Sequence, residues 1–78
     1  MLHLPRNGHK VYEVAIYNSN VRQLVMHNRS HSYVDDHWAK PQTRNVVARD
    51  EAEARKLIAE RFPPEEGFVI QRMNQSRY

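Results

Sequence analysis

The helix signal in residues 50–64 constrains the fold of this chain more than any other feature of its sequence. Asp50 is suited to cap a helix, because its carboxylate can accept hydrogen bonds from the free amides of the first turn. Glu53 follows three residues later and completes a capping-box pattern. Pro63 and Pro64 disfavour helical geometry at the residues before them, so the helix should end there. The apolar residues between these limits recur at helical spacing: Ala54, Leu57, Ile58 and Phe62.

Short segments rich in β-prone residues flank this predicted helix. Residues 45–48 precede it and residues 68–70 follow it. Gly67 can adopt the positive φ of the turn between the helix and the second of these segments. A helix of about 12 residues rises roughly 18 Å, which carries the chain back along one face of a sheet. We therefore expect the two strands to be parallel and joined by a right-handed crossover.

Residues 10–17 show the clearest strand pattern in the chain. Tyr12, Val14 and Ile16 should face the helices. The alternate residues should form the uncovered face of the sheet: Val11, Glu13, Ala15 and Tyr17. A second capping box at Asn20 and Gln23 predicts a helix that ends near Arg29.

Residues 30–43 have no regular period, and we expect a packed loop with a helical turn at residues 35–39. The chain should then comprise a flexible lead-in at residues 1–9, a single domain at residues 10–73 and a frayed tail at residues 74–78. The predicted fold is an α+β domain with the order β-α-loop-β-α-β, in which a three-stranded mixed sheet carries both helices on one face. Trp38 should close one edge of the core. The other expected core residues are Tyr12, Val14, Ile16, Val21, Leu24, Val25, Val46, Ala54, Leu57, Ile58, Phe62, Phe68 and Ile70.

This layout resembles that of short bacterial α+β proteins of unknown function. The resemblance is carried by the tyrosine-containing first strand, by residues 31–39 with their Trp38-Ala39 end, and by residues 62–70. It implies a fold and no particular activity.

Composition narrows the possible functions. The 78 residues carry a net charge of +3 and no cysteine, which excludes thiol chemistry and sites with cysteine ligands. The basic residues are concentrated in the first part of the chain, and this bias permits an anionic partner without requiring one. No apolar run approaches the ~20 residues of a membrane span, and we see no signal peptide. We expect a cytoplasmic protein.

The sequence offers little chemistry for catalysis or for a cofactor. Imidazole and carboxylate groups suit zinc or nickel, and one histidine-rich segment makes a metal-binding loop a third, less favoured hypothesis. Its candidate ligands are His27, His31, Asp35 and His37. There is no glycine-flanked serine and no glycine-rich phosphate loop. We therefore expect neither enzymatic activity nor a bound cofactor.

Two binding hypotheses remain. The favoured one is a protein-interaction module that binds a protein partner, or a second copy of itself, through a sheet edge or face. Val11, Ala15 and Tyr17 would form part of that surface. The alternative is nucleic-acid binding by a basic patch with an aromatic stacking surface. Its candidate residues are Arg22, Arg29, Tyr33, Lys40, Arg44 and Arg49.

Overall fold

The computed structural model describes residues 8–76 of the chain. Its elements in chain order are β1 (Lys10–Asn18), α1 (Ser19–Met26), the 3₁₀ helix η1 (Asp36–Ala39), β2 (Gln42–Ala48), α2 (Glu51–Arg61), the 3₁₀ helix η2 (Pro64–Glu66) and β3 (Phe68–Gln75). The predicted α+β class and the order of strands and helices are confirmed, and the expected turn at residues 35–39 is η1. Most of the predicted lead-in, residues 1–7, lies outside the described residues, and the first two residues of the predicted tail belong to β3.

The predicted mixed sheet is wrong, because β1 lies between the other two strands. The strand order is β2-β1-β3, and β1 pairs antiparallel with both neighbours. β2 and β3 therefore run in the same direction, as expected for strands joined by one helix, but they do not pair with each other. The sequence of β1 explains its central place. Apolar residues on both of its faces are buried, which is typical of an interior strand.

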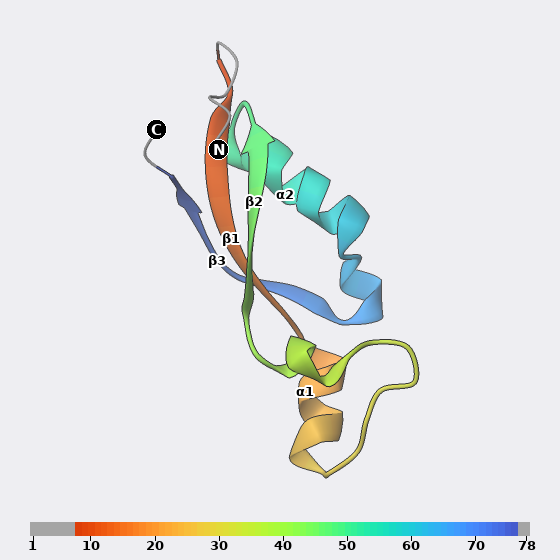
Figure 1. The fold of residues 1–78 in the computed structure, drawn as a ribbon. Helices are drawn as coiled ribbons and strands as arrows, with labels where there is room; N and C mark the ends of the chain where they lie inside the picture. The colour runs from red at the N-terminus through yellow and green to blue at the C-terminus, as the bar shows by residue number, and fades with distance from the viewer. Residues whose placement is uncertain (1–7, 77–78) are drawn as a thin grey trace.

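The prediction that both helices cover one face of the sheet is also wrong. Figure 1 shows α2 lying across one face, whereas α1 lies beyond the end of the sheet beside η1. The reason is local. α1 begins at Ser19, directly after β1 ends at Asn18, so no loop allows the chain to turn back over the sheet. Val21 is the one residue of α1 that is fully buried.

The capping residues explain where each helix begins. Asp50 caps α2 as predicted, with its Oδ1 accepting from the Glu53 amide at 2.8 Å, and the Glu53 carboxylate accepts from the Arg49 amide at 2.8 Å. α1 begins earlier than predicted, because Asn18 rather than Asn20 is its cap. The Asn18 Oδ1 accepts from the Val21 amide at 3.0 Å.

The core lies between α2 and the face of the sheet that it covers. Its buried members are Tyr12, Val14, Ile16, Ala48, Ala54 and Ile58. Trp38, Phe62 and Phe68 stack on one another at ring-centroid distances of 5.2–5.4 Å and close one end of this core. The predicted core extended too far into α1, where Leu24 is half-buried and Val25 is 38% exposed.

Candidate functional site

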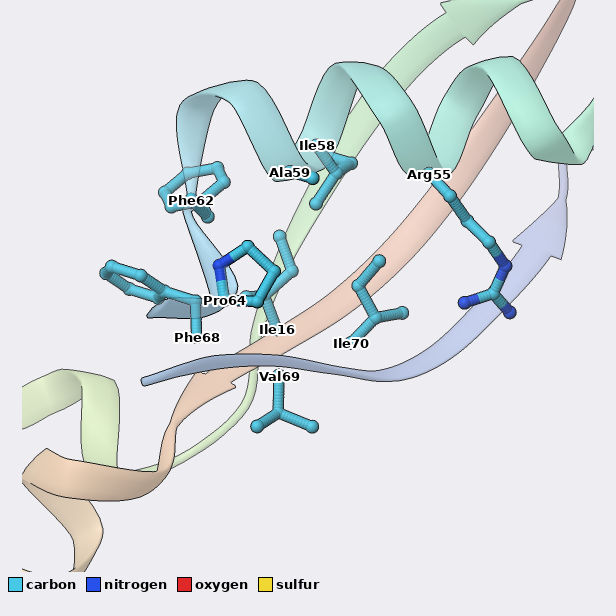
Figure 2. A pocket seen from close by; sticks show the side chains of 9 residues that line it. All are labelled: Ile16, Arg55, Ile58, Ala59, Phe62, Pro64, Phe68, Val69 and Ile70. Carbon is cyan, nitrogen blue, oxygen red and sulfur yellow. The ribbon is translucent and has the colours of Figure 1, made fainter. Parts of the chain in front are cut away.

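An apolar cleft lies between α2 and β3. Figure 2 shows α2 along one side and β3 along the other, with Ile58 and Ile70 turned into the space between them. The cleft has a volume of about 270 Å³. Its lining residues are Ile16, Arg55, Ile58, Ala59, Phe62, Pro64, Phe68, Val69 and Ile70. A space of this size and character accepts one or two apolar side chains of a ligand.

The cleft exists because α2 does not cover β3 as closely as it covers the rest of the sheet. Ala54 and Ile58 are the α2 residues that are buried in the core. Ala59, which faces β3, contributes only a methyl group, and Ile70 on the other side of the cleft stays half-exposed. The side chains of α2 are therefore larger where the helix packs on the centre of the sheet than where it faces the edge strand β3.

Arg55 supplies the charged group in the cleft lining. Its guanidinium reaches from α2 towards β3 (Figure 2) and is paired with Glu51 at 3.0 Å. Both side chains are more than half exposed, so this ion pair contributes little to stability. A ligand carboxylate could compete for the same guanidinium at small cost.

The β3 strand that borders the cleft is an edge of the sheet, and within residues 8–76 no strand pairs with its outer side. The Ser76 amide donates to the Val11 carbonyl at 2.7 Å, so the backbone amide of Ser76 points towards β1. Because the direction of the amides alternates along a strand, Met73 and Gln75 direct theirs outwards. At the cleft itself the Gly67 carbonyl accepts from the Ser19 amide at 2.8 Å, so the next amide, that of Phe68, points outwards beside the cleft.

The residues expected to form a protein-binding surface lie on the face opposite α2, but they are less accessible than that expectation requires. Val11 is 7% exposed and Ala15 is 5% exposed. Tyr17 is half-buried beneath Arg22, whose guanidinium carbon lies 3.7 Å from the ring centroid. The exposed apolar side chains of this face belong instead to Val47 and Val69, which the sequence analysis did not select.

The candidate nucleic-acid residues do not gather into one patch. Arg22 donates to the Ala39 carbonyl at 2.9 Å, and Arg44 lies over the Trp38 ring at 5.1 Å. Arg49 pairs with Glu53 at one end of the sheet, whereas α1 and the residues after it lie at the other end, about 30 Å away at the rise of a strand. Arg29, Tyr33 and Lys40 are exposed, and Tyr33 is 94% exposed.

Three of the four candidate metal ligands have other partners in this fold. The His31 Nδ1 accepts from the amides of Tyr33 and Val34 at 3.1 and 3.2 Å. His37 donates its backbone amide to the Asp35 carboxylate and places its Nδ1 at 2.8 Å from it, and these contacts lower the pKa of Asp35. Among the described residues, no three side chains of metal-binding type converge. His27 lines a surface depression near the end of α1.

Sequence reasoning missed the cleft, although it placed most of the lining residues correctly in the core. The one local feature that indicates a cleft is Ala59, a small residue next to Ile58 in a helix that packs on a sheet. That signal gains meaning only when the strand opposite Ala59 is known, and the strand order is not local information.

Comparison of the chain with protein-family models, with curated proteins and with solved structures found no match in any of the three. Within residues 8–76, both α-helices are too short and too polar to cross a lipid bilayer.

Proposed function

We propose that this chain is a small protein-interaction module that receives an extended segment of a partner protein along the outer edge of β3. The observation that carries the proposal is the position of the apolar cleft directly beside that free edge. Backbone hydrogen bonds to a sheet edge supply affinity, and a side-chain pocket next to the edge supplies specificity. The role is one of binding and not of catalysis, and we place it in the cytoplasm, with which the absence of cysteine is compatible.

Contacts within the chain favour this proposal over nucleic-acid binding. Three of the arginines in the alternative site already bind an aromatic ring, a carbonyl or a carboxylate of the same chain. By contrast, no strand within residues 8–76 pairs with the outward amides of β3.

The proposal is tested with two matched substitutions on α2. Ala59 lines the cleft, whereas Ala52 lies two turns earlier on the same side of the helix, is exposed and does not line it. Ala59→Phe should fill the cleft, and Ala52→Phe should add the same ring outside it. Thermal unfolding of both variants checks that each remains folded.

A displayed library of random peptides, selected on the full chain, supplies the probes. We expect selected peptides to shift the amide resonances of β3, and to lose affinity by about tenfold or more with Ala59→Phe but not with Ala52→Phe. If selection yields no binder, or if both variants bind equally well, the proposal is wrong. A steep fall in affinity for single-stranded nucleic acid with rising salt, with no effect of Ala59→Phe, would favour the alternative.

A further inference from the structure

The two free edges of the sheet carry charge of one sign. Arg44 is the one charged residue of β2, and Arg72 is the one charged residue of β3. Within residues 8–76, Arg72 forms no ion pair with an acidic group. The β1 strand, which has no free edge, is the strand that contains an acid, Glu13.

This distribution disfavours pairing between two copies of the chain. Edge pairing of two β2 strands, or of two β3 strands, would bring two arginines onto the same seam and the same face of the joined sheet. Like charges that face each other across a strand pair are destabilising, and opposite charges are stabilising. Charged side chains on edge strands are a common protection against self-association. An acidic strand from another protein would instead be attracted by these arginines.

The two faces of β3 set the pattern of such a strand. Phe68, Ile70 and Met73 lie on the face covered by α2, where they join the core. Arg72 pairs with Ala15 and so lies on the opposite face, beside Val69, whose side chain points away from α2 (Figure 2). An added strand alternates its side chains in the same way.

We infer that the segment received by β3 is an extended strand in which apolar residues alternate with acidic ones. The apolar residues enter the cleft between α2 and β3, and an acidic residue on the other face pairs with Arg72. This inference rests on the proposed function and adds the chemistry of the partner. Glu13 lies one strand further from the added segment than Arg72, about 5 Å more distant, so it opposes the acid less than Arg72 attracts it.

Three capped peptides of alternating sequence serve as probes: valine with glutamate, valine with glutamine, and valine with lysine. Binding to the full chain is measured by calorimetry, and the location of binding by the amide shifts of β3. We expect the glutamate peptide to bind about two- to fivefold more tightly than the glutamine peptide, and the lysine peptide to bind more weakly than both.

Two variants separate local pairing from attraction by the whole positive chain. Arg72→Glu and Lys56→Glu change the net charge equally, but Lys56 is exposed on α2 and does not line the cleft. With Arg72→Glu the lysine peptide should bind more tightly than the glutamate peptide. With Lys56→Glu the glutamate peptide should still bind more tightly. If both variants weaken binding of the glutamate peptide equally, the attraction comes from the net charge of the chain and the inference is wrong.

The outcomes also distinguish this inference from the proposed function. If all three peptides shift the amide resonances of β3 and bind with equal affinity, docking at β3 stands and the acidic pattern is wrong. If none of them shifts β3 or the cleft, both ideas fail for this surface. Sedimentation of the chain alone, with a concentration-dependent dimer that Ala59→Phe abolishes, would show that a second copy is the occupant and would overturn the inference.

Discussion

Asn18 connects three parts of the molecule through one buried amide. It is fully buried, and its Oδ1 caps α1 while its Nδ2 donates to the Glu66 carbonyl in η2 at 3.0 Å. Gly67 makes this approach possible. It has a φ of 98°, and a Cβ there would lie 2.9 Å from the Asn18 Oδ1. The Asn18 side chain therefore links the end of β1 and the start of α1 to η2, and the Ser19 amide adds a hydrogen bond to the Gly67 carbonyl at 2.8 Å.

Asn18→Ala should lower the free energy of unfolding by about 1–3 kcal/mol, because it leaves the buried Val21 amide without its cap and removes the shorter of two hydrogen bonds to the Glu66 carbonyl. Asn20→Ala is the matched control. Asn20 is exposed, and its Nδ2 reaches the same carbonyl at only 3.4 Å. Chemical denaturation of both variants gives the comparison. Equal losses for the two variants would mean that the buried amide has no special role.

Glu53 makes the stability of the chain dependent on pH. The hydrogen bond from the Arg49 backbone amide, assisted by the Arg49 guanidinium, lowers the pKa of this carboxyl below its ordinary value of 4.5. A carboxyl with a lower pKa in the folded chain contributes stability that is fully present above the unfolded value. This contribution is lost as the pH falls through the folded value.

Glu53→Gln should therefore reduce the loss of stability between neutral and acidic pH, since the amide does not titrate there. Stability at neutral pH should be slightly lower, because the charge no longer faces the first turn of α2. Denaturant midpoints across this pH range provide the measurement, with Glu65→Gln in the exposed η2 as control. An unchanged pH profile for Glu53→Gln would contradict the assignment.

At the scale of elements, α2 serves both the core and the cleft. Ile58 is 3% exposed and contacts both, whereas Leu57, which the sequence also placed in the core, is half-buried at the side of the helix. Ile58→Ala should cost about 2–5 kcal/mol, and Leu57→Ala should cost at least about 1 kcal/mol less. Denaturation curves for the two variants test the difference, and a larger loss for Leu57→Ala would mean that α2 is rotated from its position in Figure 1.

α2 was predictable from sequence and α1 was less so, for a physical reason. The cap at Asp50 and the two prolines that follow Phe62 are local signals, and each has one interpretation. The start of α1 offered two asparagines. The choice between Asn18 and Asn20 depends on which one is buried against η2. Asn18 is, and its hydrogen bond to the Glu66 carbonyl joins residues 48 apart in sequence.

The sheet and the candidate site were less predictable, because both depend on which strand lies in the middle. The pattern of β1 indicated two faces correctly, but it did not reveal that β1 has a neighbour on each side. With β3 on the outside, the cleft opens beside an edge. With β1 in the centre, Val11 and Ala15 become covered by their neighbours.

The whole molecule divides into a sheet region and a terminal region. β1, with α2 across it and strands on both sides, forms the centre of the first region (Figure 1). α1, η1 and the connecting residues 27–35 form the second, where most side chains are exposed. The regions are joined by the Asn18 cap on the Val21 amide and by Trp38 of η1, whose ring stacks on Phe62 and Phe68. Protection of backbone amides from exchange with solvent should therefore be uneven.

We expect the amides of Val14 and Ile16 to exchange only through global unfolding, and those of residues 27–35 to exchange through local opening of low free energy. Ile16 is fully buried, so Ile16→Val should lower the global free energy by about 0.5–1.5 kcal/mol. In native-state hydrogen exchange, this loss should appear at the β1 amides and leave residues 27–35 unchanged. Equal protection of the amides in both regions, or an equal response of both to Ile16→Val, would contradict this prediction. The chain would then open as one unit, with the terminal region as stable as the sheet.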